Sequence, residues 1–140
     1  MKIGLDSSVF KNRGFLAWLS LNKGKFDTYI SVIVYVETAL WYLHIGLSIS
    51  DLDRELNKMN IKVVDFTQNI AKKVAQFAKK YSKQLPFKHH ARDYLIGSTA
   101  ISLGATYFIT YNKSHFNWIS NEGIEILTPE EFVEKFYKET

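Results

Sequence analysis

The chain has 140 residues, of which 46% are hydrophobic and 23% are charged, and it contains no cysteine. This length suits one domain with one core, and the composition excludes a collagen, a long coiled coil and a wholly disordered chain. The absence of cysteine excludes a disulfide scaffold, a thiolate zinc site and a cysteine nucleophile.

The formal net charge of +4 is unevenly distributed along the chain. The segment 66–92 contains seven lysines and arginines and no acid, so it carries +7 and leaves the remaining residues at a net −3. A basic segment of this kind is compatible with a polyanionic partner, although a net charge of +4 does not require one.

The N-terminus and the most apolar stretch of the chain both indicate a protein outside the membrane. Lys2 and Asp6 flank a run too short for the apolar region of a secretory signal. The stretch 29–47 carries Glu37 near its centre, and a central acid costs ~2.5–3.5 kcal/mol on insertion. We therefore expect a buried strand and helix there, and a soluble, cytoplasmic protein with no membrane contact.

The first half of the chain alternates short apolar runs with helical segments. Strands are expected at 2–5, 28–31 and 61–64, and helices at 15–21, 32–44 and 51–59. Ser31 and Ser50 are placed to cap the second and third of these helices, and Gly46 is placed to end the second.

The second half continues the alternation. Thr67 opens a helix whose apolar residues are spaced by 4, 3, 4 and 4 positions and which ends at Pro86. A helix at 91–103 is followed by Gly104, a typical C-terminal cap. Strands are expected at 106–110 and 125–127, and Thr128-Pro129 begins a last helix that runs to 138.

Apolar strands that alternate with helices predict a parallel sheet covered on both faces. In such sheets ligands bind at the carboxyl ends of the strands. Residues that follow a strand or begin the next helix are therefore the candidates for chemistry.

Three acids stand in apolar sequence, two of them at such positions: Asp6, Glu37 and Asp93. An ionised carboxylate is costly to bury alone, and three that converge repel one another unless a cation lies among them. Each acid also has a structural interpretation. Asp6 could be a turn or cap residue, Glu37 a helix acid paired with a lysine or His44, and Asp93 a first-turn acid favoured by the helix dipole.

Four motifs together resemble the PIN domain, and in size the chain resembles its VapC-type toxins. They are Asp6 in Ile3-Gly4-Leu5-Asp6-Ser7-Ser8, Glu37 after the second strand, Asp93 in Asp93-Tyr94-Leu95-Ile96-Gly97-Ser98-Thr99-Ala100, and Ile109-Thr110-Tyr111-Asn112. The resemblance implies one PIN-like domain over 1–140, with an α/β fold of three layers (α/β/α) around a central parallel sheet of about five strands.

The resemblance also implies a metal-dependent ribonuclease that uses Mg²⁺ or Mn²⁺, leaving 5′-phosphate and 3′-hydroxyl ends. Asp6, Glu37 and Asp93 match the acids that hold the metal. Thr110 and Asn112 match the Thr-x-Asn motif after the fourth strand, with Thr110 orienting an acid.

His115 occupies the position at which many family members carry a fourth acid. Imidazole suits manganese, iron or zinc better than magnesium. One metal could therefore suffice, His115 could favour a softer ion, or the activity could be weak. His115 could equally be a solvated loop histidine.

The helix from Thr67 carries lysines opposite its apolar face, and further basic residues lead from its end to Asp93. Phosphates of an RNA could bind this track while one of them reaches the metal. The expected RNA-binding residues are Lys72, Lys79, Lys83, Lys88 and Arg92. The lysine stripe could instead be a solvated face, and His89 and His90 are better explained as a flexible loop pair than as metal ligands.

The aromatic residues of the two early helices are first of all candidates for the core: Phe15, Trp18, Tyr35, Trp41 and Tyr42. The resemblance suggests that they form a groove for an antitoxin or a homodimer face.

The leading hypothesis is a metal-dependent endoribonuclease toxin with RNA as substrate, a protein antitoxin as partner and a homodimeric state. Three alternatives remain open. One is an RNA-processing or DNA-structure nuclease, and another is a catalytically inactive RNA- or protein-binding domain. The last is a phosphatase with Asp6 as nucleophile, which ranks low because Ser8 stands where its second aspartate is expected.

Overall fold

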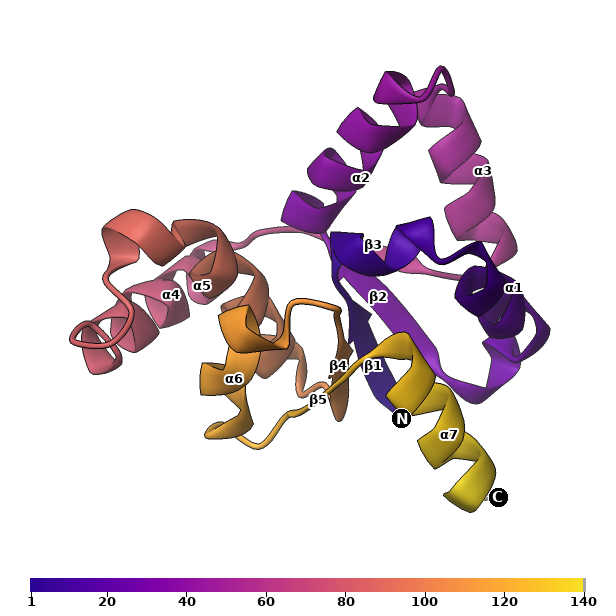
Figure 1. Cartoon of the computed structure of the whole chain (residues 1–140). Helices are drawn as coiled ribbons and strands as arrows, with labels where there is room; N and C mark the ends of the chain where they lie inside the picture. The colour runs from indigo at the N-terminus through magenta and orange to yellow at the C-terminus, as the bar shows by residue number, and fades with distance from the viewer. Residues whose placement is uncertain (140) are drawn as a thin grey trace.

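The computed structural model describes the backbone of residues 1–139 and the side chains of residues 1–138, so Thr140 of the expected domain lies outside it. The centre is a parallel five-stranded sheet in the order β3-β2-β1-β4-β5 (Figure 1). Its strands are β1 (Lys2–Leu5), β2 (Asp27–Ser31), β3 (Lys62–Val64), β4 (Tyr107–Ile109) and β5 (Glu125–Leu127). The α/β class and all five expected strands are confirmed.

The helices are α1 (Arg13–Leu21), α2 (Val32–His44), α3 (Ile49–Lys58), α4 (Gln68–Lys80), α5 (Phe87–Leu103), α6 (Lys113–Ser120) and α7 (Pro129–Glu139). Short 3₁₀ turns occupy Ser7–Lys11 (η1) and Lys23–Lys25 (η2). Six of the α-helices correspond to those expected from the sequence. The turns η1 and η2 and the helix α6 were not expected.

The N-terminal caps explain where three helices begin. Ser31 accepts a hydrogen bond from the backbone N of Val34 at 3.1 Å, and Thr67 accepts one from Ile70 at 3.2 Å. Thr128 and Glu131 cap α7 reciprocally, each side chain bonding the backbone N of the other. These caps confirm the starts that the sequence indicates for α2, α4 and α7.

The expected cap at Ser50 is wrong, because α3 begins two residues earlier with Ser48 as its cap. The Ser48 hydroxyl accepts from the backbone N of Asp51 at 3.1 Å, and the Asp51 carboxylate accepts from the backbone N of Ser48 at 2.8 Å. This reciprocal pair satisfies the backbone N–H groups of Ser48 and Asp51. With a cap at Ser50, these two groups would have to bond water instead.

The connection between α4 and α5 also differs from expectation. The helix α4 ends at Lys80, and the backbone N of Leu85 bonds Tyr81 in a separate turn. Pro86 then caps α5, which starts at Phe87 and contains one non-helical residue, His90, with φ −129°. The expected start of this helix at residue 91 lies directly after that interruption.

Two aromatic clusters cover the two faces of the sheet. Tyr107 of β4 packs on Phe132 of α7, in a cluster that Trp18 of α1 joins. The next residue, Phe108, points the other way onto Phe116 of α6, with ring centroids 4.8 Å apart. Because successive strand residues face opposite sides, the helices form two layers around the sheet, as expected (Figure 1).

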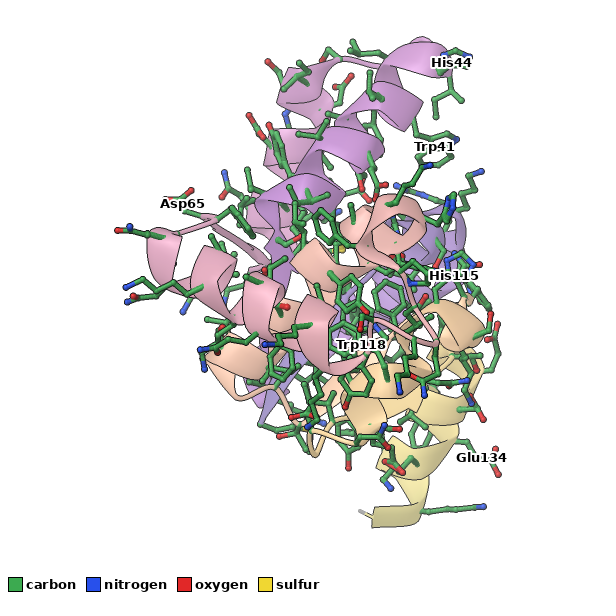
Figure 2. The ribbon with its side chains drawn as sticks, turned by 90° about the vertical axis from the view of Figure 1, so that its left-hand side faces the viewer. Trp41, His44, Asp65, His115, Trp118 and Glu134 are labelled. Carbon is green, nitrogen blue, oxygen red and sulfur yellow. The ribbon has the colours of Figure 1, made fainter. Side chains whose placement is uncertain are left out.

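The layer formed by α4, α5 and α6 depends on a close approach at Gly97. The ring of Trp118, labelled in Figure 2, packs against Tyr94 of the same layer with ring centroids 5.1 Å apart. A Cβ atom at Gly97 would lie 2.4 Å from Cζ2 of Trp118. Glycine therefore allows α6 to sit directly on α5.

The apolar stretch 29–47 is folded as β2 and α2, in agreement with the expectation of a strand and a helix. In the part of the chain that the structure describes, no helix combines the length and hydropathy needed to cross a bilayer.

Candidate active site at the carboxyl edge of the sheet

Asp6 lies directly after β1, and its side chain is fully buried. Its backbone N donates to the carbonyl of Ile109, the last residue of the neighbouring strand β4. The pairing of β1 with β4 therefore brings Asp6 beside Thr110, whose hydroxyl donates to Oδ2 of Asp6 at 2.8 Å. Ser8 donates to the same oxygen at 3.2 Å.

The loop after β4 holds Thr110 in this orientation. The backbone N of Asn112 donates to the Thr110 hydroxyl at 2.9 Å, so the hydroxyl proton is directed to Asp6. The backbone N of Tyr111 donates to Ser8 at 3.1 Å. Asn112 thus acts here through its backbone, and its side chain is exposed.

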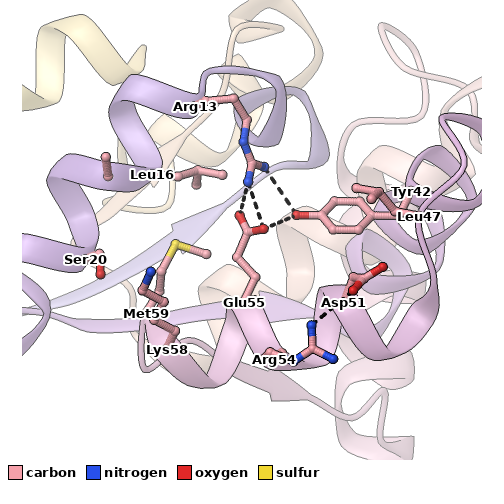
Figure 3. A pocket seen from close by; sticks show the side chains of 11 residues that line it. Arg13, Leu16, Ser20, Tyr42, Leu47, Asp51, Arg54, Glu55, Lys58 and Met59 are labelled. Carbon is pink, nitrogen blue, oxygen red and sulfur yellow. Dashed lines mark hydrogen bonds and ion pairs between the residues drawn. The ribbon is translucent and has the colours of Figure 1, made fainter.

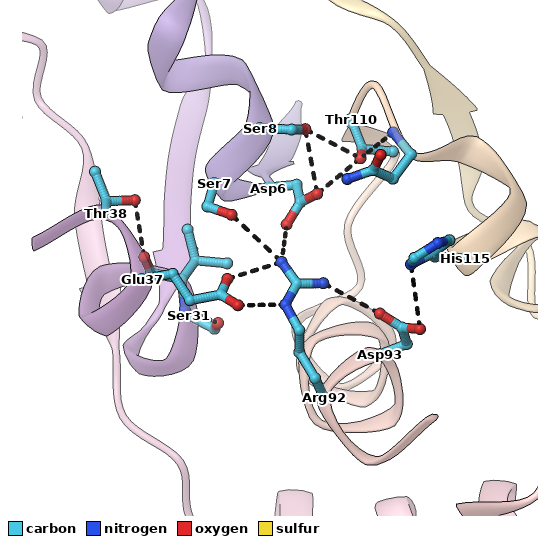
Figure 4. A network of polar contacts seen from close by, with 12 residues as sticks. Asp6, Ser7, Ser8, Ser31, Glu37, Thr38, Arg92, Asp93, Thr110 and His115 are labelled. Atoms are coloured by element: carbon cyan, nitrogen blue, oxygen red, sulfur yellow. Dashed lines mark hydrogen bonds and ion pairs between the residues drawn. The ribbon is translucent and has the colours of Figure 1, made fainter. Parts of the chain in front are cut away.

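Glu37 and Asp93 join Asp6 through one guanidinium group, that of Arg92 (Figure 4). Nη2 of Arg92 donates to Oδ1 of Asp6 at 2.8 Å and to Oε1 of Glu37 at 2.7 Å. Nε donates to the other oxygen of Glu37, and Nη1 donates to Oδ1 of Asp93 at 3.1 Å. The three acids predicted from the sequence therefore converge, and we call them with Arg92 the carboxylate cluster.

The cluster is largely shielded from water. Asp6 is 0% exposed and Asp93 is 10% exposed, while the side chains of Glu37 and Arg92 are about one third exposed. Burial by itself lowers the pKa of Arg92, but the hydrogen bond to Glu37 and the negative charges of Asp6 and Glu37 outweigh it. The pKa of Arg92 therefore lies above its ordinary value, and the guanidinium stays charged.

The structural interpretations of the three acids are tested by the same contacts. Asp6 precedes η1 but its side chain makes no cap bond there. Glu37 pairs with Arg92 rather than with a lysine or His44, which lies at the far end of α2 (Figure 2). Asp93 lies in the first turn after the interruption of α5 at His90, as the first-turn interpretation expects, and its carboxylate also pairs with Arg92.

Two histidines flank Asp93. Nδ1 of His115 lies 3.5 Å from Oδ2 of Asp93, and Nδ1 of His90 lies 3.8 Å from the same atom. His115 comes from α6, the helix that the sequence did not predict. His89, which directly precedes His90 in the sequence, is exposed.

The basic residues expected to bind RNA differ in their surroundings. Four of the five are exposed, and they make no ion pair with any side chain that the structure describes: Lys72, Lys79, Lys83 and Lys88. The neighbouring Lys80, which is not one of the five, pairs with Glu122 at 2.8 Å, and this contact raises the pKa of Lys80. Arg92, by contrast, is engaged in the carboxylate cluster.

The carboxylate cluster fits a divalent cation only in part. Its three acids offer oxygen ligands alone, which are those that Mg²⁺ prefers, and they already surround one cation. That cation is a guanidinium, however, and among residues 1–138 no group of three Asp, Glu or His side chains is arranged to hold a metal ion as it stands. Asp6, Glu37 and Asp93 are thus suitable ligands once the guanidinium has moved.

Sequence reasoning missed the position of Arg92 within the cluster and the roles of Ser7 and Ser8. Ser7 accepts a hydrogen bond from Nη2 of Arg92 at 3.3 Å, and Ser8 bonds Asp6. Arg92 directly precedes Asp93 in the sequence, but no sequence signal places it beside Asp6 or Glu37.

The aromatic residues of the early helices are mainly core. Phe15 and Tyr42 are buried, and the other three are partly buried against them. A cleft of about 440 Å³ lies instead between α1 and α3 (Figure 3). Arg13 of α1 bonds Glu55 of α3, and Glu55 also accepts a hydrogen bond from the Tyr42 hydroxyl at 2.7 Å. This cleft shares no residue with the carboxylate cluster.

The fold and the cluster together define an α/β protein with an acidic site at the carboxyl edge of a parallel sheet. The PIN domain family profile matches residues 6–120, and the chain belongs to the PIN domain family. No curated protein matches the sequence significantly.

Among solved structures, the chain is similar to VapBC2 from Rickettsia felis bound to a promoter DNA fragment, with 20% identity and a TM-score of 0.68 over 90% of this chain and 98% of that one. It is also similar to VapBC-1 from nontypeable Haemophilus influenzae, with 21% identity and a TM-score of 0.66 over 93% and 99%. A third similar structure is a toxin–antitoxin complex from Klebsiella pneumoniae, with 19% identity and a TM-score of 0.65 over 91% of this chain and 97% of that one. At these identities the likeness concerns the fold.

Proposed function

We propose that this protein is a metal-dependent endoribonuclease and the toxin of a toxin–antitoxin pair, built as one PIN-like domain over 1–140. The observation that carries the proposal is the convergence of Asp6, Glu37 and Asp93 on one cation at the carboxyl edge of the sheet. Membership of the PIN family supports a nuclease.

Asp6, Glu37 and Asp93 would hold the metal, Mg²⁺ or Mn²⁺, directly or through water. When bound, the ion supplies an activated water and neutralises charge on the phosphate oxygens. Thr110 orients Asp6 by its hydrogen bond, and Ser8 and the backbone of Asn112 support that orientation. Burial excludes bulk water from Asp6, which strengthens its electrostatic interactions.

RNA is the proposed substrate because exposed cations precede the cluster in the chain. Lys88 lies four residues before Arg92 in α5, with the non-helical residue His90 between them. Lys72, Lys79 and Lys83 belong to the segment that leads to Lys88. Contacts of this type bind phosphates without reading sequence. With RNA as its substrate, the protein is proposed to act in the cytoplasm.

A protein antitoxin is the proposed partner, in keeping with the toxin–antitoxin complexes that share the fold. The cleft between α1 and α3 is the proposed seat of an antitoxin segment. It is concave, and it combines apolar walls at Leu16 and Met59 with the charges of Arg54 and Glu55. Such a pocket suits a side chain inserted from a different molecule.

A homodimer is also proposed, through the outer face of α2. Three aliphatic side chains follow one another along this face at spacings of 4 and 3 residues, and each is 50–61% exposed: Val36, Leu40 and Leu43. We call them the α2 stripe. A convex aliphatic stripe can pack on a copy of itself about a two-fold axis, which a concave cleft cannot do.

The test is cleavage of a labelled single-stranded RNA by the purified protein with MnCl₂ or MgCl₂. Asp6→Asn should abolish cleavage, because it removes a charge from the ligand set while keeping the side-chain shape. Asp65→Asn is the matched control, since Asp65 is exposed and lies in a loop away from His115 (Figure 2).

Cleavage that persists in Asp6→Asn or in EDTA would refute the proposal. Cleavage of structured DNA in preference to RNA would favour the DNA-structure nuclease. RNA binding without divalent ions and without cleavage would favour the inactive binding domain.

A further inference from the structure

Arg92 occupies the centre of the carboxylate cluster and engages most of its oxygens. Of the six carboxylate oxygens, its guanidinium binds four: Oδ1 of Asp6, both oxygens of Glu37 and Oδ1 of Asp93. Three acids from three separate elements thus share one resident cation.

The two remaining oxygens are not equally available. Oδ2 of Asp6 already accepts from Thr110 at 2.8 Å and from Ser8 at 3.2 Å. Oδ2 of Asp93 faces His115 at 3.5 Å and accepts no hydrogen bond from the residues that the structure describes. A divalent cation held by two or three of these acids must therefore use oxygens that the guanidinium now binds.

The charges lead to the same conclusion. Three carboxylates and one guanidinium leave a formal −2 in a site where Asp6 is fully buried. Without any cation among them the carboxylates would repel one another strongly. Arg92 thus stabilises the cluster when no metal is bound, and a divalent ion would balance the same carboxylates in its place.

We propose that Arg92 is the built-in counter-ion of the carboxylate cluster and that a divalent cation binds by displacing its guanidinium, so that Arg92 sets the affinity of the site for metal. The proposal rests on the proposed function, because it takes these carboxylates as the metal ligands. The guanidinium can leave the cluster toward solvent, because the Arg92 side chain is 34% exposed. Arg92 also lies two residues after the non-helical His90, where the helix is interrupted. The displaced guanidinium can then contact a substrate phosphate, as expected from the sequence.

The test is calorimetric titration of Mn²⁺ into the wild-type chain, Arg92→Gln and Lys11→Gln. Lys11→Gln removes the same charge from an exposed position in η1 and serves as the matched control. Because a site closed by the guanidinium binds with reduced apparent affinity, Arg92→Gln should bind Mn²⁺ at least about tenfold more tightly than wild type. Lys11→Gln should stay within about twofold of wild type, because Lys11 is exposed and its charge is screened by solvent.

Mn²⁺ binding by Arg92→Gln that is equal to or weaker than that of wild type would overturn the proposal. The absence of Mn²⁺ binding to both the wild-type chain and Arg92→Gln would overturn it as well. Since Arg92→Gln leaves three carboxylates without their cation, its thermal midpoint should fall without metal and rise more with Mn²⁺ than that of wild type.

If Arg92→Gln does not fold, the proposal is tested on the wild-type chain by following the NMR signal of the Arg92 Nε–H group. Titration with Mg²⁺ should move this signal to the position of a solvated arginine as the cluster saturates. A signal that stays in place while the Asp93 amide reports saturation would overturn the proposal.

The two proposals fail separately. RNA cleavage that needs Mn²⁺ and Asp6, together with unchanged metal affinity in Arg92→Gln, would leave the proposed function standing and remove the role of Arg92. Tighter Mn²⁺ binding by Arg92→Gln without RNA cleavage by any variant would support the role of Arg92 and remove the ribonuclease.

Discussion

The hydroxyl of Thr110 donates a 2.8 Å hydrogen bond to the carboxylate of Asp6 across 104 positions of sequence. Both residues follow directly on strands that pair in register, β1 and β4, so the sheet itself fixes their separation. Asp6 is fully buried, and this bond decides which of its oxygens faces Arg92.

Thr110→Val should lower kcat/KM for RNA by about 10–100-fold, the usual effect of removing a group that orients a metal ligand. The same change leaves a buried carboxylate with one donor fewer and should cost about 1–3 kcal/mol of unfolding free energy. Steady-state cleavage and urea unfolding measure the two effects. Thr110→Ser keeps the hydroxyl and should behave nearly as wild type. Equal losses in Thr110→Val and Thr110→Ser would show that the hydrogen bond is unimportant.

Removing three exposed lysines should weaken RNA binding and its dependence on salt. The variant combines three substitutions: Lys72→Gln, Lys79→Gln and Lys83→Gln. In a plot of the logarithm of the RNA-binding constant against the logarithm of the salt concentration, the magnitude of the slope should fall by about 0.7 for each phosphate that the variant no longer neutralises. Fluorescence anisotropy in EDTA measures binding without cleavage. The control combines Lys23→Gln, Lys25→Gln and Lys58→Gln, which removes the same charge outside the basic segment. An identical slope in both triple variants would mean that Lys72, Lys79 and Lys83 are only solvated surface residues.

Leu40→Lys should turn a dimer into a monomer without affecting the fold. Leu40 is 61% exposed in the α2 stripe, so the change costs no core packing but places a charge in the proposed contact. Sedimentation velocity gives the oligomeric state, and Leu21→Lys is the matched control at a more exposed leucine of α1. A wild-type monomer, or a dimer that survives Leu40→Lys, would rule out the stripe as the dimer face.

Gly97→Ala should destabilise the protein by about 1–3 kcal/mol, because the added Cβ would clash with the ring of Trp118. Gly24→Ala serves as control, since a Cβ there meets no atom within 4 Å. Urea unfolding of both variants measures the difference. A change below about 0.5 kcal/mol in Gly97→Ala would mean that α6 can shift without cost.

The sequence predicted the sheet and six helices because their signals are local. The cap at Thr128 with Glu131 and the apolar spacing after Thr67 depend only on neighbouring residues. Helix α6 was missed because its residues 113–120 are mixed in polarity. Its packing comes from tertiary contacts, of Phe116 with Phe108 of β4 and of Trp118 with Tyr94 of α5.

The meeting of Asp6, Glu37 and Asp93 was predictable from strand ends and family motifs, but the place of Arg92 was not. Arg92 adjoins Asp93 in sequence and belongs to a basic segment, so its charge suggested a contact with RNA. Only the three-dimensional arrangement brings its guanidinium between acids 55 and 86 positions away. Long-range ion pairing of this kind leaves no periodic pattern in the sequence.

The central claim is that Asp6, Glu37 and Asp93 form a divalent-cation site. A crystal soaked in MnCl₂ tests it most directly, through the anomalous scattering of manganese. We predict one strong peak among these three carboxylates, within ligand distance of at least two of them, with the guanidinium of Arg92 withdrawn. A crystal that shows no peak there, with Arg92 still bound to all three acids at a Mn²⁺ concentration that saturates the protein in solution, would contradict the claim.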